Sequence, residues 1–432
     1  MKVLNISAAH PYKTAGIVVA DCHQMLRDHQ YESKILTIYA PESNDKNVIS
    51  YQNFFENRFE SYSNRFLGKF FPKTYNTVYY YEGSDETIPK YNTKSIIRRL
   101  NGFQPDVIIV YFIYGFVNIQ NIYELSKYWN VPVFWYLMDM RAMTGGCAYT
   151  WACEGYQNQC GKCPAIASTE ANDITAKNLA YAKNLVAQMD LTLIIASEQL
   201  RLEASKSSLF RDKKFYKIFC PINDAIFNSE QYDRPALKVK YKSVSNKRTL
   251  LIGAVSLKEK RKGFHLLLGA LEKLIKEQDV NVELLVAGHV SEVLKATLQS
   301  FVPKVTINYL GYLNYNQLAE VFNITDAFIS TSVMDSGPMM INQSILCGTP
   351  VIAFDIGIAK DLVVSGKTGY KMDEINENAL FQAILDFLKL SEGAVQQLRR
   401  NCIELGKQEL TSKVIGDKID KMLRSNLQNV SK

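Results

Sequence analysis

The stretch that decides the fold runs from Met334 to Asp355 and reads MDSGPMMINQSILCGTPVIAFD. It begins with a Ser-Gly-Pro turn, continues at helical spacing, breaks at Gly-Thr-Pro and ends in a short apolar run. A turn, a helix and a buried strand in this order are typical of a parallel sheet covered by helices. The stretch therefore predicts an α/β domain.

The length and composition of the chain indicate two globular domains. Its 432 residues exceed what one ordinary core holds, and 47% hydrophobic with 22% charged residues is normal for a folded protein. The net charge of +7 comes without a nucleic-acid-binding motif, so we expect no nucleic acid partner. We also find neither a secretory leader nor an apolar run of roughly 18 residues, which predicts a cytoplasmic protein.

Two series of strand-like runs, each followed by helix-like stretches, predict two Rossmann-like doubly wound domains. A polar, basic segment at 221–247 separates the two series. We predict a first domain over 1–225 and a second over 226–411, with a C-terminal helix near 412–430 that packs back on the first domain. Because ligands bind outside the carboxyl ends of parallel strands, two such sheets facing each other predict a site in the cleft between them.

A basic turn follows the first strand of the second domain. Arg261 and Lys262 precede Gly263 where a strand gives way to a helix. Cations at such a turn suit a diphosphate, although a solvated basic turn explains the same residues equally well.

The opening stretch contains a second candidate for phosphate binding. Ser336 and Gly337 lead through Pro338 into a helix whose first N–H groups, near Met339 and Met340, have no helical partner. Such N–H groups are able to donate to phosphate oxygens. An ordinary Gly-Pro helix start is the alternative.

Together, RKG at 261–263, the stretch 334–355 and GKTGY at 366–370 resemble the donor domain of glycosyltransferase family 4. Members of this family are retaining enzymes with the GT-B fold, which has two facing Rossmann-like domains and a cleft between them. The resemblance implies a glycosyltransferase that moves a sugar from a nucleotide-diphosphate sugar to a glycan acceptor. It also implies an acceptor-side first domain and a donor-binding second domain.

The resemblance assigns roles to residues of the second domain. Asp335 takes the first position of the family's paired glutamates, which contacts the donor sugar, and Gln343 takes the second, which binds the ribose. Lys262 and Arg261 hold the diphosphate, while Ser256 stands where many members have another arginine. With these cations at the diphosphate, the resemblance implies catalysis by Asp335, Lys262 and Arg261 without a metal ion or a protein nucleophile.

Gln343 changes the expected strength of ribose binding more than its geometry. A glutamine still offers an acceptor and a donor to two hydroxyl groups. It loses the charge-assisted part of the bonds, about 1 to 2 kcal/mol. Asp335 is shorter than a glutamate, so the choice of sugar is expected to differ from the family norm.

The first domain has two candidate positions. Gly16 stands where the family has a glycine pair that the donor phosphate approaches, and Ala15 precedes it. The three-glycine dinucleotide fingerprint is absent, which argues against hydride transfer. Asp139 ends a predicted strand and either orients an acceptor hydroxyl or anchors its loop; Met138 replaces the histidine that often precedes it in related enzymes.

Four cysteines cluster in GGCAYTWACEGYQNQCGKCP, with gaps of five, six and two residues: Cys147, Cys153, Cys160 and Cys163. In a cytoplasmic protein the cluster suggests a structural zinc site. Two disulfides or four reduced thiols are equally compatible with this spacing. A similar Thr-Gly-Gly-Cys loop occurs in a bacterial branch of the family associated with exopolysaccharide and capsule assembly.

An aromatic and basic segment at 53–73 predicts an amphipathic helix. Its aromatic face suits burial on the first sheet or contact with an anionic membrane equally well. The resemblance implies a lipid-linked acceptor, which favours a peripheral contact with the inner face of a membrane.

Two other functions remain open. Gln343, Met138 and Ser256 depart from the family pattern, as expected of a catalytically silent nucleotide-sugar-binding or assembly subunit. An epimerase would need acid–base residues in the cleft, and five histidines in the whole chain give it little support.

Overall fold

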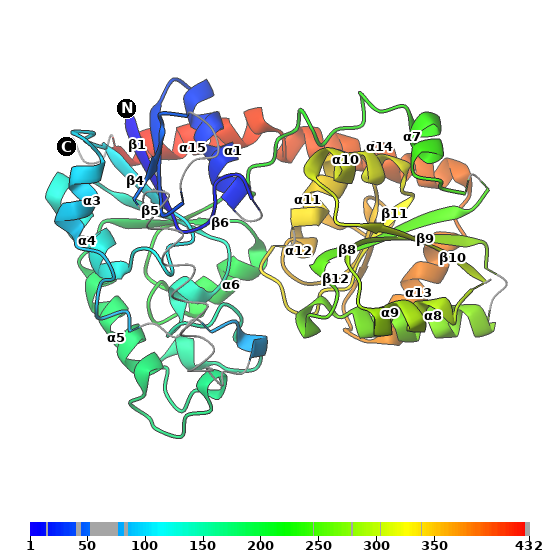
Figure 1. The fold of residues 1–432 in the computed structure, drawn as a ribbon, viewed down its shortest axis with the longest axis horizontal. Helices are drawn as coiled ribbons and strands as arrows, with labels where there is room; N and C mark the ends of the chain where they lie inside the picture. The colour runs from blue at the N-terminus through cyan, green and yellow to red at the C-terminus, as the bar shows by residue number, and fades with distance from the viewer. Residues whose placement is uncertain are drawn as a thin grey trace. The chain divides into compact units, whose positions relative to one another are not determined.

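The computed structural model describes residues 1–13, 16–39, 45–51, 77–81, 85–244, 246–277, 280–302, 304–337 and 339–427. The chain forms two compact units (Figure 1). Unit 1 contains Met1–Ala196, Leu200–Pro221 and Ile415–Lys432, and unit 2 contains Ser197–Gln199 and Ile222–Val414.

Unit 1 is built on a parallel sheet with the described strand order β3-β2-β1-β4-β5-β6-β7. The order reverses beside β1, which pairs with β2 on one side and β4 on the other, as in a doubly wound fold. The strands are β1 (Lys2–Ser7), β2 (Glu32–Thr37), β3 (Val48–Ser50), β4 (Val107–Val110), β5 (Val133–Leu137), β6 (Leu191–Ile195) and β7 (Phe215–Lys217).

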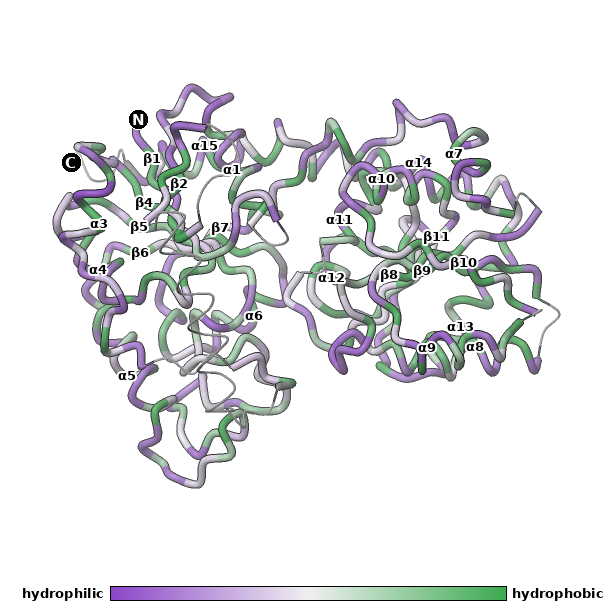
Figure 2. The backbone as a smooth tube through the Cα atoms, viewed as in Figure 1, coloured by the Kyte–Doolittle hydropathy of each residue, from purple (hydrophilic) through white to green (hydrophobic). Residues whose placement is uncertain are grey.

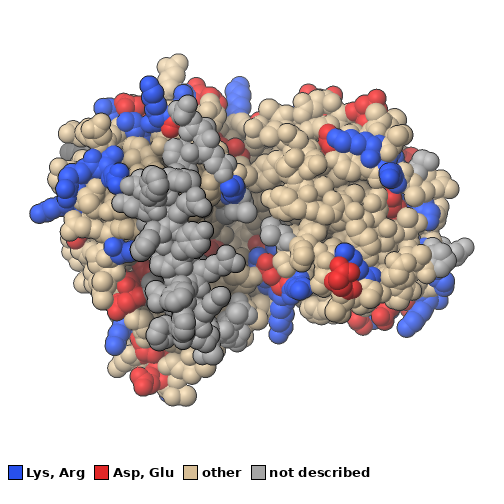
Figure 3. Space-filling view, viewed as in Figure 1, with Lys and Arg blue, Asp and Glu red and all other residues tan. Residues whose placement is uncertain are grey.

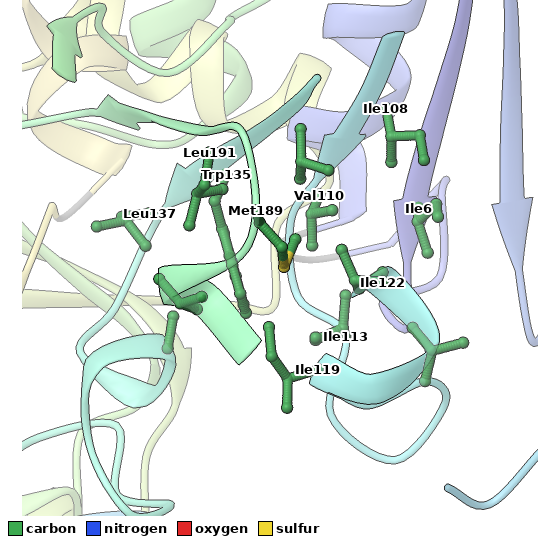
Figure 4. Packing of buried hydrophobic residues seen from close by; sticks show 14 of the residues in the cluster. Ile6, Ile108, Val110, Ile113, Ile119, Ile122, Trp135, Leu137, Met189 and Leu191 are labelled. Carbon is green, nitrogen blue, oxygen red and sulfur yellow. The ribbon is translucent and has the colours of Figure 1, made fainter. Parts of the chain in front are cut away.

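Helices cover this sheet and bury its apolar side chains. They are α1 (Ile17–Asp28), α3 (Thr93–Arg99), α4 (Ile119–Trp129), α5 (Ile174–Ala187) and most of α6 (Glu198–Lys206) and α15 (Ser412–Leu427), with short 3-10 turns η2 (Thr77–Tyr79), η3 (Arg141–Met143), η4 (Gly155–Gln157) and η5 (Pro164–Ile166). Figure 4 shows Ile6, Val110 and Trp135 of three strands packed with Ile119 and Ile122 of α4. Strands covered by helices on both faces are apolar throughout, which explains runs such as VIIV in β4.

The C-terminal helix α15 belongs to unit 1. Its Asp417 lies 2.9 Å from His29 Nε2, and Tyr31 Oη donates to Asp420 at 2.5 Å. In Figure 1 this red helix lies beside the blue α1. These polar contacts fix the end of the chain against the first sheet.

Unit 2 has its own parallel sheet, with the described order β10-β9-β8-β11-β12-β13. The strands are β8 (Arg248–Ser256), β9 (Val282–His289), β10 (Val305–Gly311), β11 (Ala327–Ser330), β12 (Val351–Phe354) and β13 (Gly369–Met372). The helices are α7 (Arg234–Lys240), α8 (Phe264–Glu277), α9 (Glu292–Gln299), α10 (Tyr315–Ile324), α11 (Met339–Leu346), α12 (Ala359–Leu362), α13 (Glu377–Leu388) and α14 (Glu392–Glu409), with the 3-10 turn η6 (Lys260–Lys262). β8, β9 and β11 are green in Figure 2, as expected for strands that form the core.

The prediction of two doubly wound α/β domains is confirmed, but two edge strands were missed. β3 has only three residues, too few for a periodic signal. β13 begins at Gly369, where a Cβ atom would lie 1.8 Å from the carbonyl oxygen of Val351, so only glycine allows this close pairing. The chain passes into unit 2 after Pro221. Within that unit, Asp224 Oδ1 accepts from Ser412 Oγ at 2.6 Å.

Charged side chains are interspersed in sign over the visible face of unit 2 (Figure 3). Among the described residues, no helix is long and apolar enough to cross a membrane. The predicted amphipathic helix at 53–73 lies outside the described residues.

Candidate functional site

Two loops of unit 2 meet where β8 and β11 end. These strands are parallel neighbours, so their carboxyl ends share one edge of the sheet. The Val333 N–H donates to the carbonyl of Arg261 at 2.8 Å, and Thr331 Oγ1 donates to the carbonyl of Lys262 at 2.6 Å. The basic turn and the opening stretch of the sequence are thereby joined.

An ion cluster forms at this junction. Asp335 Oδ2 lies 2.6 Å from Lys262 Nζ and 3.0 Å from Arg261 Nη1. Arg261 Nη2 also lies 2.8 Å from Glu259 Oε2. Two cations therefore face two carboxylates, and the formal charges balance. The side chains predicted to hold a diphosphate are already compensated by the protein itself.

Burial makes this pairing strong. The side chains of Asp335, Arg261 and Lys262 are only 8%, 14% and 20% exposed. Burial alone raises the pKa of Asp335, but the charges of Lys262 and Arg261 outweigh it and hold that pKa below its usual value. Asp335 is therefore a fixed anion against the two cations.

The start of α11 lies directly beyond this anion. The Gly337 N–H donates to Asp335 Oδ1 at 3.3 Å, and a Cβ atom at Gly337 would meet nothing within 4 Å. Ser336 is buried, whereas Met339 and Met340 are half-buried, and Pro338 lies outside the described residues. The open space at Gly337 is what a backbone phosphate site requires.

The sequence of unit 2 matches one protein family. Residues 236–409 match the family described as Glycosyl transferases group 1. The matched residues all lie within unit 2, and we refer to them as the group 1 domain. The ion cluster and α11 both lie inside the matched residues.

Known proteins resemble part of this chain in sequence and the whole chain in fold. Granule-bound starch synthase 1 of Triticum aestivum is 23% identical over 167 residues, which are 38% of this chain and 26% of that protein. The chain thus matches about a quarter of that curated relative's length. Sucrose-phosphate synthase of Thermosynechococcus elongatus has a TM-score of 0.69 at 16% identity over 99% of each chain. HepE of Anabaena, solved with UDP and glucose, has a TM-score of 0.63 at 16% identity over 98% of this chain and 100% of its own. The two structures show a shared GT-B type fold.

Gln343 lies within α11 of the group 1 domain and is buried. Beside it, Asn342 Oδ1 is buried and has no hydrogen-bond partner among the described residues. The ribose role of Gln343 remains a prediction.

Asp355 is a neighbouring acidic position to which sequence reasoning gave no role. It follows the last residue of β12. Its Oδ2 lies 2.6 Å from Lys360 Nζ, and its Oδ1 lies 3.2 Å from Lys371 Nζ. Burial raises its pKa, but bonds to the two lysines outweigh this and lower it overall. Lys371 belongs to β13, the strand that the sequence did not reveal, so this partner was not predictable without the sheet order.

A cavity of about 740 Å³ lies elsewhere in the group 1 domain. Its lining includes Arg248 and Val282, which begin β8 and β9, so it lies at the amino ends of the strands. The ion cluster stands at the opposite, carboxyl edge, where ligands of doubly wound sheets bind. The cluster is therefore the candidate functional site.

Unit 1 provides structural reasons for its two predicted positions. A Cβ atom at Gly16 would lie 1.9 Å from the carbonyl oxygen of His10, so the turn before α1 needs glycine for its own packing. Ala15 lies outside the described residues. Asp139 Oδ1 accepts from the Arg141 N–H at 2.8 Å, which anchors the loop after β5. An acceptor role for Asp139 remains a prediction.

The four clustered cysteines of unit 1, predicted to form a metal site, line one small cavity. All eight cysteines of the chain are free thiols. Among the described residues, no group of three or more His, Cys, Asp or Glu side chains is arranged to hold a metal ion.

Two glycines of the group 1 site differ in how strictly the fold requires them. Gly263 has φ +60°, and a Cβ atom there would lie 2.0 Å from the carbonyl oxygen of Thr331. We expect Gly263→Ala to lower the free energy of unfolding by more than about 1 kcal/mol. Gly337→Ala should change it by less than about 0.5 kcal/mol, because the methyl group enters open space. Urea unfolding of both variants tests this, and equal stability would contradict the geometry.

The ion cluster also predicts a pH dependence. Asp335→Asn removes the carboxylate from two buried cations and should cost about 3 to 5 kcal/mol at neutral pH. The folded-state pKa of Asp335 is lowered, so its stabilisation is complete above the ordinary Asp pKa of about 4 and is lost as pH falls through the lowered value. The difference in unfolding free energy between wild type and Asp335→Asn should therefore shrink below about pH 4.

Urea unfolding of Asp335→Asn and wild type between pH 3 and 7 measures this difference. The exposed Asp373 of the same unit provides the control variant Asp373→Asn, which should follow wild type. A deficit that is constant across the whole pH range would exclude an ionic role for Asp335.

Proposed function

We propose that this protein is a retaining glycosyltransferase that moves a sugar from a nucleotide-diphosphate sugar to a glycan acceptor. The observation that carries the proposal is the pairing of Lys262 and Arg261 with Asp335 inside a group 1 glycosyltransferase domain. Lys262 and Arg261 have the charge to bind a diphosphate. Asp335 is beside them, where the donor sugar would lie.

Donor binding is an exchange of anions in this proposal. The diphosphate of the donor takes over Lys262 and Arg261 from Asp335, and the first N–H groups of α11 donate to its oxygens. Because an anion replaces an anion, the buried cations remain compensated throughout. The freed carboxylate of Asp335 becomes an acceptor for hydroxyl groups of the donor sugar.

Sugar transfer then depends on charge stabilisation. The bond from the sugar to the diphosphate breaks, and Lys262 and Arg261 neutralise the negative charge that develops on the departing phosphate. The acceptor hydroxyl attacks the sugar on the face from which the diphosphate leaves, and the hydroxyl proton passes to the departing phosphate. These protein cations suffice for the diphosphate without a metal ion. Positioning and electrostatics supply the acceleration in place of a protein nucleophile.

HepE was solved in complex with UDP and glucose, which suggests uridine-diphosphate sugars as the first donors to test. A lipid-linked acceptor in surface polysaccharide biosynthesis completes the proposal, with the protein in the cytoplasm against the inner face of the membrane. This part rests on the resemblance of the Thr-Gly-Gly-Cys loop, since the segment at 53–73 lies outside the described residues.

A catalytically silent nucleotide-sugar-binding subunit is the second candidate. Gln343 in place of a glutamate and Met138 in place of a histidine favour it. A silent subunit binds donor sugars without breaking them, whereas a transferase also hydrolyses them slowly when no acceptor is present. Measuring donor hydrolysis by the purified protein separates the two functions.

The lysine of the ion cluster tests the transferase directly. We expect Lys262→Ala to reduce transfer and donor hydrolysis at least 100-fold, since it removes a cation aimed at the leaving group, an effect of about 2.7 kcal/mol or more. The exposed Lys258 on the same loop has no such contact among the described residues, and Lys258→Ala should retain wild-type activity. Full activity of Lys262→Ala would overturn the assignment.

The glutamine on α11 tests the nucleotide role. Gln343→Glu restores a carboxylate that accepts from two ribose hydroxyls, and should tighten nucleotide binding by about 1 to 2 kcal/mol with kcat unchanged. Isothermal titration with the nucleoside diphosphate and steady-state kinetics measure both quantities. Binding that does not change would remove Gln343 from the ribose site.

A further inference from the structure

The cysteine loop of unit 1 encloses a cavity that no side chain fills. Its volume is about 20 Å³, roughly the space that one water molecule needs. The lining contains the four cysteines Cys147, Cys153, Cys160 and Cys163, and otherwise only glycine, threonine and tyrosine among the described residues. Four thiols thus surround one small space that has no charged side chain in its wall.

Glycines bring the backbone of this loop close enough for the sulfurs to approach one another. A Cβ atom at Gly145 would lie 2.2 Å from the carbonyl oxygen of Thr175, and one at Gly161 would lie 2.0 Å from that of Ala171. A Cβ atom at Gly155 would lie 3.6 Å from Cys153 Sγ and 3.8 Å from Cys160 Sγ. A side chain at Gly145 or Gly161 would collide with these carbonyl oxygens and push the loop open, whereas a methyl group at Gly155 would make ordinary contacts with the two sulfurs.

The loop is also fixed to the rest of unit 1. The Cys163 N–H donates to Asp173 Oδ2 at 3.1 Å, and Asp173 also caps α5. Cys147 forms an antiparallel bridge with Tyr81, and the Ala148 N–H donates to the carbonyl of Tyr79 at 3.1 Å. These contacts hold the first and last cysteines of the cluster in place without any disulfide.

We propose that this cavity binds one zinc ion as a structural site, with Cys147, Cys153, Cys160 and Cys163 as its four ligands. Zinc in structural sites is tetrahedral and favours four thiolates at about 2.3 Å. The ion replaces the four S–H protons, which pass to solvent, and four Zn–S bonds form. The cavity has room for one small ion, and its four sulfur ligands are the donor set that zinc favours.

No group of three or more His, Cys, Asp or Glu side chains in the described ranges is arranged to hold a metal ion, so binding requires the four thiols to move inward. Each cysteine has one rotatable bond between its backbone and its sulfur, so this movement costs little backbone change. The ion would cross-link the loop that follows β5 and Asp139 to the start of α5. The inference does not depend on the proposed transferase activity.

The metal content of the purified full-length chain tests the site. We expect about one zinc per chain by inductively coupled plasma mass spectrometry, and near zero in Cys147→Ser and Cys160→Ser. Cys220 is a buried cysteine of the same unit that does not line the cavity, so Cys220→Ala should keep the metal. A wild-type chain without zinc, or variants that retain it, would overturn the proposal.

A second experiment needs no variant and covers the case in which the serine variants fail to fold. The wild-type chain is unfolded in denaturant, with a chelator present to remove any metal. Its reactive thiols are then counted. All eight cysteines should react, and a count of four would show two disulfides in place of zinc. Cobalt exchanged into the protein should give the intense visible absorption of a tetrahedral thiolate site. Absence of this absorption would leave a packed thiol cluster as the correct description.

Discussion

The pairing of Asp335 with Lys262 and Arg261 is the interaction on which the account of this protein depends. Three charged side chains are mostly withdrawn from water, and each is tolerable there only because the others are present. The same requirement makes the site selective. A ligand that removes Asp335 from the cations has to bring negative charge of its own, which a diphosphate does and a neutral sugar does not.

The strand order of the parallel sheet brings these charged side chains together. β8 and β11 are distant in sequence but adjacent in the sheet, so the loops after them leave from the same edge. Gly263 lets the first loop approach the second within contact of the Thr331 carbonyl, and hydrogen bonds from Thr331 and Val333 lock the two together. Backbone geometry therefore places the charges before any ligand binds, and this preorganisation is what charge stabilisation in catalysis requires.

The sequence predicted the doubly wound fold and singled out Arg261, Lys262 and Asp335, because strand-like runs and the residues at 261–263 and 334–355 are local patterns. It gave no role to Glu259, the fourth member of the cluster. It did not predict that Asp335 would neutralise the two cations, since that depends on which strands are neighbours. Lys371 was not recognised for the same reason, and β13 was missed because its first residue is a glycine that serves close pairing. The gathering of the cysteines around one cavity likewise depends on the close backbone packing that Gly145 and Gly161 allow.

In the proposed function, Asp335 occupies the diphosphate position until the donor arrives. This role of Asp335 is tested most directly by calorimetric titration of Asp335→Asn and wild type with the nucleoside diphosphate that binds the wild-type chain most tightly. Without its internal competitor, the variant should bind at least tenfold more tightly, because the diphosphate no longer has to displace two charge-assisted contacts and one such bond is worth about 1.4 kcal/mol. Equal or weaker binding by the variant would show that the diphosphate does not take the place of Asp335.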